Sequence, residues 1–592
     1  MTVRRSASAA LVMLLIASWH VVPGAKAGSR RVAAGQSTSS HEPDVAVPMR
    51  DGVVLLADVL RPSSEGRFPT LVYRTPYGRK DALAEYTTVT RAIERGYAVV
   101  VQDVRGRYGS GGDFRPYENE GCDGYDTIEW AARQPWSNGR VGTFGLSYPG
   151  AVQWLAAVEN PPHLDAMVPA MTFSTPQNFF YSGGIWDLSW IQWIWGSIAD
   201  DARARKHAGA PGGKAPQWSA VGGKMLRTLP LDQLEELREI APYYYDWLHH
   251  PPEDPFWNFA ELRGKYGRTR AAVLNLSGWN DDNYGPEGAV TNYLGLIEAR
   301  GGRPDRTALL IGPWLHGVDA TARTRFGDRD FGRAAAIDYD EVVLDWMDRY
   351  VRDDRNAAPI DGARYFVMGD NRWKTSDTWP PRGRPSIFYL SPASPGSRGA
   401  LTPAPREGTP APSTFLSDPD DPVTNPYESS GVHDYQMLAK RRDVLTFDSA
   451  PLDRDTEVTG PIRARVFLSC DCRDTDLWVR VLDVAPNGTA WNLMSPGIDA
   501  VRVSYRDLSK GRQLLSPNDI YEVELGNLVT SNLFLRGHRV RVQISSTFFP
   551  NFSRNLHSGE LETTSSRKQT ATIRIHHDSE HPSQVSLHVI ER

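Results

Sequence analysis

Apolar residues along the chain follow two periods, and the first part alternates between them. Runs that are apolar throughout occupy 70–73, 97–102 and 141–144, and amphipathic runs separate them at 86–95 and 126–133. Strands that are apolar on both faces and alternate with helices are typical of a parallel sheet covered on both sides. The pattern therefore predicts an α/β core.

The same core pattern is preceded by two strands and interrupted by an insertion. Residues 45–60 predict two strands around a turn, and residues 171–268, which are rich in tryptophan and helix formers, predict a helical cap. Strand-like runs return at 272–276 and 308–311, and the stretch 339–352 predicts an amphipathic helix that completes the core.

Beyond residue 375 the apolar positions alternate with polar ones in short runs between proline-rich segments. Runs of this kind lie at 462–468, 478–482 and 539–544. Such strands have one solvent-exposed face, and they predict a C-terminal β-sandwich of the jelly-roll type. The expected domains are the α/β core at 42–170 and 269–355, the cap at 171–268, and the β-sandwich at 375–592.

Composition narrows the classes of partner. The chain has 592 residues, 40% of them hydrophobic, and its 66 basic against 71 acidic residues give a net charge of −5. A chain of this length is expected to form several domains. A chain without a basic excess is not expected to bind nucleic acid or a membrane surface. A small-molecule substrate is the class of partner that remains, and the composition does not indicate the oligomeric state.

The N-terminus has the pattern of an export signal. Arg4 and Arg5 precede an apolar run at 9–16, and the A-K-A sequence at 25–27 fits the rule for signal-peptide cleavage. The alternative is a membrane anchor, but the run is well short of the ~20 residues that a spanning helix needs. We expect a signal peptide at 1–27, export to the periplasm or the extracellular space, and no stable membrane anchor. The arginine pair leaves the twin-arginine route open.

Three cysteines, Cys122, Cys470 and Cys472, are too few to form a disulfide framework in a chain of this length. The C-x-C pair alternates along a predicted strand, with no histidine or further cysteine nearby to complete a zinc site. We expect buried or idle thiols, and no metal or organic cofactor.

Residues 145–150, GLSYPG, match the G-x-S-x-G motif and lie between a short strand and the helical run 151–157. A serine on such a turn is held in a strained conformation with its hydroxyl exposed. An ordinary glycine-rich turn is the alternative, but the strand before and the helix after the motif favour a nucleophile. Ser147 is thus predicted to be the nucleophile of a serine hydrolase.

A serine hydroxyl needs a histidine to take its proton and an acid to orient that histidine. In an α/β-hydrolase the acid and then the histidine follow later strands of the sheet. Asp281 and Asp282 follow the run at 272–276, and His316 lies in a Gly/Pro loop after the run at 308–311. His316 is the predicted base, whereas the pattern alone leaves the acid open between the two aspartates.

Several motifs, in this order, resemble the cocaine esterase and α-amino-acid ester hydrolase family, whose relatives include the X-prolyl dipeptidyl peptidases. The resemblance covers nearly all of the chain after the predicted signal peptide. The motifs are YRTPYG at 73–78, DVRGRYGSGG at 103–112, WSNGRVG at 136–142, GLSYPG at 145–150, GWND at 278–281 and IGPWLH at 311–316, with further similarity at 474–484 and 544–555.

The resemblance implies roles for individual residues. Ser147 matches the family's nucleophile, His316 its base and Asp281, rather than Asp282, its acid. Tyr77 matches a tyrosine whose hydroxyl would hold the oxyanion beside the backbone N–H of Tyr148. From its own sequence context alone, Tyr77 would be interpreted as a packed aromatic residue.

One feature departs from the family. The amino-acid ester hydrolases have carboxylates two and three residues after the acid, where this chain has Asn283 and Tyr284. Binding of a substrate ammonium group by that cluster is therefore not expected, although Asp282 and Asp187 remain as candidate carboxylates.

Trp186 and Trp190 are four residues apart, and a helix would place them on one face. That face would either suit an apolar acyl group or pack the cap onto the core.

The sequence thus predicts a serine hydrolase that cleaves a carboxylic ester or amide through an acyl-enzyme on Ser147. An X-Pro dipeptidyl peptidase is the first alternative. A non-catalytic protein that binds glycans or surfaces is the second.

Overall fold

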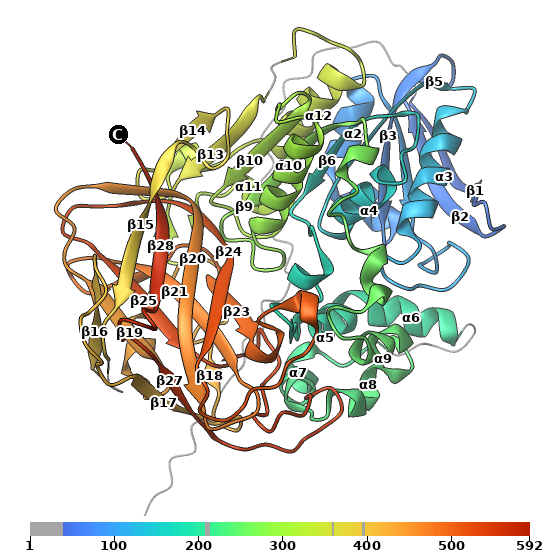
Figure 1. Cartoon of the computed structure of the whole chain (residues 1–592). Coiled ribbons are helices and arrows are strands. Elements are labelled where there is room, and N and C mark those ends of the chain that lie inside the picture. The colour runs from blue at the N-terminus through green and yellow to red at the C-terminus, as the bar shows by residue number, and fades with distance from the viewer. Residues whose placement is uncertain (1–38, 208–213, 358–359, 394–396, 592) are drawn as a thin grey trace, which may run out of the picture.

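The computed structural model describes residues 39–207, 214–357, 360–393 and 397–591, so the predicted signal peptide lies outside the described residues. The described chain forms an α/β core, a helical cap beside it and a C-terminal domain made mostly of strands (Figure 1). Both domains of the predicted fold are present, with the cap inserted between two halves of the core.

The core contains one ten-stranded sheet. Its seven central strands, from β4 to β13 in the sheet order, run parallel, while β1, β2 and β14 are antiparallel to their neighbours. The strands, in sheet order, are β1 (Ser40–Pro48), β2 (Val54–Arg61), β4 (Ala98–Asp103), β3 (Phe68–Thr75), β5 (Ser137–Leu146), β6 (Leu164–Ala170), β9 (Ala272–Gly278), β10 (Thr307–Gly312), β13 (Gly362–Val367) and β14 (Arg372–Ser376).

Helices cover both faces of this sheet. α3 (Glu120–Ala132) and α4 (Tyr148–Ala157) pack together over one face, and α2 (Thr87–Glu94) and α12 (Tyr339–Tyr350) pack together over the other. Successive residues of one strand, such as Leu71 and Val72, belong to the two different cores. Because helices cover both faces of the sheet, neither face of these strands is exposed to solvent, which explains why the strands are apolar throughout.

The core sheet extends further along the chain than expected. Strands β13 and β14 join it after the boundary predicted at residue 355, and together they form an antiparallel hairpin at its edge. The other core helices are α1 (Arg79–Glu85), α10 (Glu287–Ala299) and α11 (Val318–Thr321).

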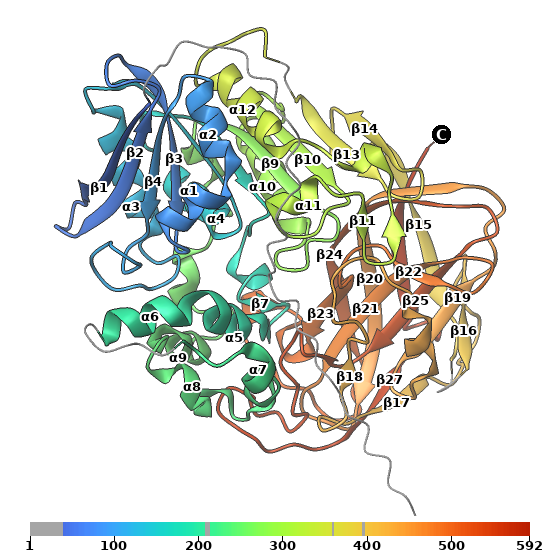
Figure 2. The same ribbon diagram turned by 180° about the vertical axis from the view of Figure 1, so that it is seen from behind.

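The cap consists of short helices that lie below the core and beside the β-domain (Figure 2). They are α5 (Ser189–Trp193), a π-helical turn (Ile194–Ile198), α6 (Ala199–Lys206), α7 (Trp218–Arg227), α8 (Glu235–Arg238) and α9 (Pro242–His249). A two-stranded hairpin of β7 (Tyr181–Ser182) and β8 (Ile185–Trp186) precedes them.

The C-terminal domain is organised around one long antiparallel pair, β20 with β24. Its principal strands are β15 (Gly383–Leu390), β16 (Arg398–Thr402), β17 (Ser413–Ser417), β19 (Leu445–Ser449), β20 (Thr456–Cys470), β21 (Asp476–Val484), β22 (Ala490–Asn492), β23 (Ile498–Arg502), β24 (Tyr521–Phe534), β25 (Arg539–Ser545), β27 (Ala571–Ile575) and β28 (Gln584–Ile590). At the core, the Met368 N–H donates to the Ser531 carbonyl at 3.0 Å, which joins the end of β13 to β24.

The cysteine prediction was wrong for one pair. Cys470 and Cys472 form a disulfide at the end of β20, because the turn that follows the strand brings the two side chains to the same side. Cys122 is a free, exposed thiol.

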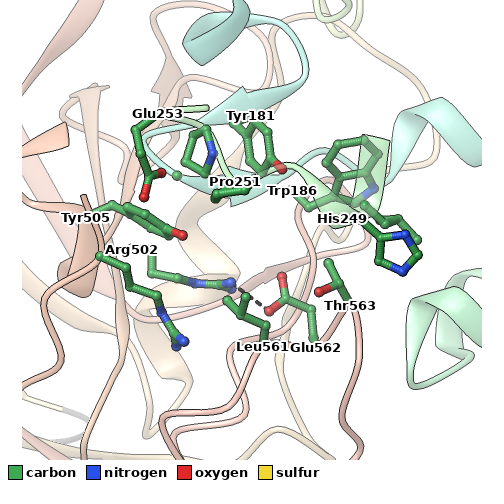
Figure 3. Close-up of a pocket in the computed structure, with 14 residues that line it drawn as sticks. Tyr181, Trp186, His249, Pro251, Glu253, Arg502, Tyr505, Leu561, Glu562 and Thr563 are labelled. Atoms are coloured by element: carbon green, nitrogen blue, oxygen red, sulfur yellow. Dashed lines mark hydrogen bonds and ion pairs between the residues drawn. The ribbon is translucent and has the colours of Figure 1, made fainter. Parts of the chain in front are cut away.

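The cap and the β-domain share a closely bonded junction. The Ser553 N–H donates to the Trp186 carbonyl at 2.9 Å, and the Leu231 N–H donates to the Glu562 carbonyl at 2.9 Å. A cavity of about 270 Å³ lies at this junction, between Tyr181 of the cap and Tyr505 of the β-domain (Figure 3). None of the helices in the described ranges is long and apolar enough to cross a membrane.

Candidate active site

The predicted nucleophile lies on a sharp turn between β5 and α4. β5 ends at Leu146, α4 begins at Tyr148, and Ser147 between them has φ 71° and ψ −129°. A positive φ is rare for a residue with a side chain, and it persists only where the surroundings impose it. The Ser147 N–H donates to the Ala170 carbonyl at 3.0 Å, which fixes the turn against β6. This is the geometry expected of a G-x-S-x-G nucleophile.

The glycines of this motif are required by the close approach of strand and helix. A Cβ atom on Gly150 would lie 2.5 Å from the Ala170 carbonyl oxygen, and one on Gly145 would lie 2.5 Å from the Pro149 Cβ. Both distances are well below van der Waals contact. Any side chain at either position would push α4 away from the sheet and displace Ser147.

The predicted base and acid are joined by a hydrogen bond. The neighbouring strands β9 and β10 end at Gly278 and Gly312, and the loops after them carry Asp281 and His316. His316 Nδ1 lies 3.0 Å from Asp281 Oδ1. The Asp281 side chain is fully buried, whereas that of His316 is 17% exposed. Solvent or a substrate can therefore reach this pair only at the His316 side chain.

The surroundings of this pair favour the protonated imidazole. Burial lowers the pKa of His316, but the Asp281 carboxylate, with a smaller contribution from Asp282, more than offsets this and raises it above its usual value. The Asn283 N–H donates to Asp281 Oδ1 at 3.0 Å and holds the carboxylate in place. An imidazole oriented in this way can accept a proton and remain stable while it carries the charge.

The Tyr77 hydroxyl lies at the nucleophile. Tyr77 follows β3, and its hydroxyl lies close enough to Ser147 to interact with it. The indole N–H of Trp193, in cap helix α5, donates to the Tyr77 oxygen at 3.1 Å. Burial raises the pKa of Tyr77 to about 12, so the phenol stays protonated at neutral pH. The resemblance assigned Tyr77 to this place, but no motif pointed to Trp193.

Tyr148 brings two separate groups to the site. It is the first residue of α4, where backbone N–H groups have no acceptor within the helix. Its side chain is fully buried: the hydroxyl donates to Glu120 Oε1 at 2.7 Å and accepts the Tyr117 N–H at 3.0 Å. The side chain anchors the first turn of α4, and the N–H remains for an oxyanion.

One further tyrosine lies at Ser147 and another lies beside it, although sequence reasoning gave neither a catalytic role. The Tyr284 hydroxyl lies close enough to interact with both Ser147 and Tyr117. The Tyr284 ring stacks on Phe179, with centroids 5.1 Å apart, and its centroid lies 5.6 Å from that of His316. Tyr284 stood out in the sequence only as a replacement for a carboxylate, and no motif marks Tyr117.

A cavity of about 120 Å³ adjoins the acid and is lined by carboxyl groups from all three parts of the molecule. Asp187 comes from the cap, Asp282 and Glu287 from the core, and Asp499 from the β-domain. Burial raises the pKa of Asp187 and of Asp499 to about 6 and that of Glu287 to about 8. No lysine or arginine of the described chain lines this cavity, so it favours a cation or a proton donor.

The two cap tryptophans singled out in the sequence are packing residues. Trp186 is 1% exposed, and Trp190 stacks on Phe180 with centroids 4.9 Å apart. Trp193, one turn further, is the cap tryptophan that reaches the site. In the described ranges, no group of three or more His, Cys, Asp or Glu side chains is arranged to hold a metal ion.

Comparison with known proteins agrees with this architecture. Residues 51–318 match the X-Pro dipeptidyl-peptidase (S15) family, and residues 358–586 match the X-Pro dipeptidyl-peptidase C-terminal non-catalytic domain. Cocaine esterase of Rhodococcus sp. (strain MB1 Bresler) is 34% identical over 580 residues, which cover 93% of this chain and 98% of that protein.

Solved structures share the fold along almost the whole chain. An α-amino acid ester hydrolase superposes with a TM-score of 0.80 at 24% identity, covering 95% of this chain and 98% of its own. An aminopeptidase from the marine sediment archaeon Thaumarchaeota archaeon also has a TM-score of 0.80, at 22% identity, covering 96% of this chain and 99% of its own.

The fold and these relatives define the protein as a serine hydrolase with an α/β-hydrolase core. The chain belongs to the X-Pro dipeptidyl-peptidase (S15) family, which is also the family of its esterase relatives.

Proposed function

We propose that the protein hydrolyses small carboxylic esters through an acyl-enzyme on Ser147, with His316 and Asp281 completing a catalytic triad. His316 takes the Ser147 proton as Oγ attacks the carbonyl carbon, and Asp281 balances the charge on the imidazole. The carbonyl π electrons move onto oxygen. When they return, the bond to the alcohol breaks and the alcohol receives the proton from His316. Water then releases the acid by the same sequence.

The oxyanion in this mechanism is held by Tyr77 and by the backbone N–H of Tyr148. The Tyr77 phenol keeps its proton at neutral pH, because burial raises its pKa to about 12. The N-terminus of α4 adds the positive end of its dipole at the same place. Donors that are fixed before the reaction stabilise the charge that develops in the transition state.

One observation carries the proposal. Ser147 is held at φ 71° beside the Tyr77 hydroxyl, and Tyr284 neighbours both Ser147 and His316, which is hydrogen-bonded to Asp281. The test is a panel of p-nitrophenyl acyl esters and matched anilides, measured on wild type and on Ser147→Ala. We expect ester turnover in wild type and its loss in the variant. Turnover that survives the substitution would rule out the mechanism.

A dipeptidyl peptidase that cleaves after X-Pro is the second candidate, and the carboxyl-lined cavity beside Asp281 favours it. A peptide substrate would bring an N-terminal ammonium group, which Glu287 and Asp499 could hold. A chromogenic X-Pro anilide compared with an ester of similar size separates the two functions. Faster turnover of the anilide would replace the esterase assignment.

The non-catalytic alternative has its own test. An active serine hydrolase of this kind should react with a fluorophosphonate at Ser147, and Ser147→Ala should not. Absence of labelling in folded wild-type protein, under conditions that label a related esterase, would favour a binding protein.

We also propose that the protein is exported after cleavage near residue 27. The proposal is supported by the charged, apolar and small-residue segments at the N-terminus. Expression of the full-length gene should yield a mature chain that starts near Gly28 outside the cytoplasm. An intact N-terminus on cytoplasmic protein would contradict it.

A further inference from the structure

We infer that Tyr284 is a second catalytic hydroxyl at Ser147, one that orients the nucleophile and stabilises it as its proton leaves; the inference rests on the proposed esterase mechanism. Tyr284 is the side chain that contacts both halves of the reaction centre. Its hydroxyl lies close enough to Ser147 to interact with it, and its ring lies against that of His316, with centroids 5.6 Å apart.

The loop that carries the acid also holds Tyr284. The Tyr284 N–H donates to Asp281 Oδ1 at 3.3 Å, and His316 Nδ1 pairs with the same oxygen at 3.0 Å. The Gly285 N–H donates to the Asp281 carbonyl at 3.0 Å and closes the turn. On its other side, the Tyr284 ring stacks on Phe179 at an interplanar angle of 19°. The hydroxyl is therefore placed by the same contacts that place the acid and the base.

The directions of the hydrogen bonds at Ser147 follow from a count of donors. A serine hydroxyl has one proton to donate and two lone pairs that accept. When Ser147 gives its proton to His316, the electrons of the O–H bond stay on Oγ as a third lone pair. One pair attacks the carbonyl carbon and two can accept, and Tyr77 and Tyr284 are the two hydroxyls that lie beside this oxygen. Both phenols can donate to the same oxygen.

Each of these phenols is itself supplied by a second donor. Trp193 has only an N–H to give, so it donates to the Tyr77 oxygen and leaves the Tyr77 proton for Ser147. The Tyr117 hydroxyl neighbours that of Tyr284 and has a proton of its own to give, so it can donate to the Tyr284 oxygen. Burial has the larger effect on Tyr284 and raises its pKa overall, so it keeps its proton at neutral pH.

Two oriented chains of donors thus converge on one oxygen, Trp193 to Tyr77 and Tyr117 to Tyr284. As the proton moves from Ser147 to His316, negative charge grows on Oγ, and donors that already point at it stabilise that charge. They also select the rotamer in which Oγ faces the substrate carbonyl, which reduces the entropy lost on attack. Tyr77 has a single proton, so its hydroxyl turns from Oγ to the carbonyl oxygen as that oxygen becomes negative, whereas Tyr284 stays with Oγ on the side of His316.

The decisive variant is Tyr284→Phe, which removes the hydroxyl and keeps the ring. We expect kcat for a p-nitrophenyl ester to fall roughly 10- to 100-fold, somewhat less than for a donor aimed at the oxyanion. KM should change less than about threefold, since the hydroxyl acts on the nucleophile rather than on bound substrate.

Tyr117→Phe should also lower kcat, by a smaller factor than Tyr284→Phe. Tyr293→Phe is the matched control: its buried hydroxyl has no hydrogen-bond partner and lies on α10, away from Ser147, so kcat should not change.

Rates are expressed per active site, titrated by the burst of p-nitrophenol, so that a misfolded fraction does not count. Wild-type kcat in Tyr284→Phe would overturn the inference. Faster fluorophosphonate labelling of Tyr284→Phe would also overturn it, because the hydroxyl would then obstruct Ser147. Ser147→Ala distinguishes this failure from failure of the esterase mechanism. If Ser147→Ala is inactive and Tyr284→Phe is fully active, only the role of Tyr284 is rejected.

Discussion

Ser147 combines a strained backbone with two neighbouring phenol hydroxyls, those of Tyr77 and Tyr284. The strain at φ 71° costs folding free energy, and it persists because Gly145 and Gly150 allow α4 and β6 to hold the turn from both sides. The benefit is a hydroxyl that meets Tyr77 and Tyr284 without reorganisation. The reactivity of Ser147 therefore depends on which neighbouring hydroxyl groups direct their protons at its Oγ.

The pH dependence of kcat/KM should report the protonation of His316. As a base, His316 must be unprotonated in the free enzyme, and its pKa lies above the usual value because Asp281 and Asp282 more than offset burial. We expect kcat/KM to rise with pH through a midpoint above about 6.5 and then level off. Asp281→Asn should shift the midpoint to lower pH and reduce kcat roughly 10⁴-fold, because an amide favours the wrong tautomer.

Asp282→Asn is the control for this profile. It should shift the midpoint in the same direction by less and keep most of kcat, because Asp282 makes the smaller contribution and does not contact Nδ1. A midpoint that does not move in Asp281→Asn would assign the titration to another group.

Loss of the Tyr77 hydroxyl should affect the oxyanion. Tyr77→Phe is expected to lower kcat by roughly 10²- to 10³-fold, the usual effect of losing one oxyanion donor. Trp193→Phe should cause a smaller loss, since Tyr77 keeps its proton but loses the donor that orients it. Steady-state kcat on one ester provides the measurement. Tyr243→Phe, which removes a buried hydroxyl without a partner, is the control and should behave like wild type.

The sequence predicted the residues whose motifs are local, and it did not predict roles that arise from tertiary contact. Ser147, Asp281 and His316 each follow a strand within a few residues, so their places could be read from the pattern. The contact of Tyr284 with Ser147 joins two strand ends that are far apart in the chain. No spacing rule encodes such a contact.

At the level of elements, the apolar runs located the central strands well. The run expected at 272–276 is β9 (Ala272–Gly278), and the helix expected at 339–352 is α12 (Tyr339–Tyr350). β6 (Leu164–Ala170) was not predicted, because Asp165 and Pro169 are atypical of a central strand.

α10 (Glu287–Ala299) was also missed, because it contains two glycines and helix-interior glycines weaken the helical pattern. The structure explains one of them: a Cβ on Gly288 would lie 2.3 Å from the Thr172 carbonyl oxygen. Tertiary packing thus required residues that local propensity disfavours.

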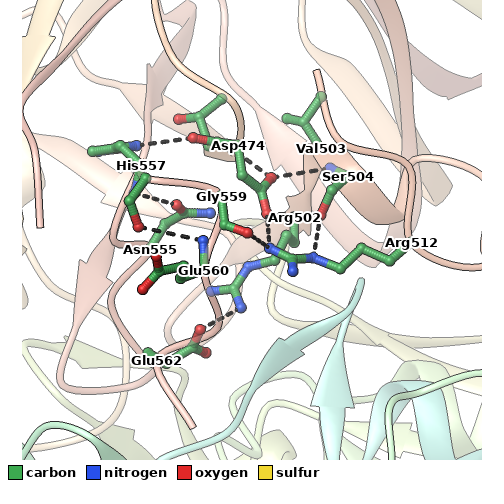
Figure 4. A network of polar contacts seen from close by, with 12 residues as sticks. Asp474, Arg502, Val503, Ser504, Arg512, Asn555, His557, Gly559, Glu560 and Glu562 are labelled. Carbon is green, nitrogen blue, oxygen red and sulfur yellow. Dashed lines mark hydrogen bonds and ion pairs between the residues drawn. The ribbon is translucent and has the colours of Figure 1, made fainter. Parts of the chain in front are cut away.

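The polar network beneath the junction of cap and β-domain should be essential for stability (Figure 4). Arg502 donates to Asp476 at 2.9 Å and to Glu562 at 2.6 Å, and all three side chains are at most 3% exposed. Arg502→Met would leave two buried carboxylates without a counter-charge, a loss of about 3–5 kcal/mol. We expect a clearly lower denaturant midpoint for the unfolding of the β-domain.

An exposed ion pair provides the comparison. Arg465 and Glu522 are 44% and 41% exposed, so Arg465→Met should cost only about 0–1 kcal/mol. Equal midpoints for the two variants would show that the buried network contributes no more than a surface pair.

At the scale of the whole molecule, the candidate active site is built from residues of all three parts of the chain. The cap supplies Trp193 and Asp187, the core supplies the proposed nucleophile, base and acid, and the β-domain supplies Asp499. A cavity lined by five carboxyl groups from parts this distant in the chain has no signature in any single segment. It could be found only once the three parts were in place.

Buried histidines in the β-domain should make the folded state sensitive to acid. His557 and His577 are at most 1% exposed, and burial lowers the pKa of both to about 4. In the unfolded chain each would titrate near 6.5. Between these values the unfolded state binds more protons, so stability falls as the pH drops from about 6.5 towards 4, by up to roughly 3 kcal/mol for each histidine.

The carboxyl groups of the cavity act in the opposite sense. The pKa of Glu287 is raised to about 8 by burial, so the folded state takes up a proton that the unfolded state does not, and stability rises as the pH falls from about 8 towards 4. The two effects can be separated by substitution. His577→Gln can still bond to the Ser413 hydroxyl, which lies 2.7 Å from His577 Nε2, and it should lose less stability between pH 7 and pH 5 than wild type.

The stability of Glu287→Gln relative to wild type should change in the reverse direction. The variant should gain most stability over wild type above pH 7, where the wild-type carboxylate is ionised without a positively charged partner among the described residues. Denaturant unfolding of both variants at a series of pH values provides the measurement, and His207→Gln, at a side chain that is 48% exposed, is the control. If His577→Gln and wild type lose stability in parallel from pH 7 to pH 5, His577 is not the group that makes the fold sensitive to acid. If Glu287→Gln brings no gain at high pH, a cation from solution balances the carboxylate in the folded protein, and raising the salt concentration should then stabilise wild type more than the variant.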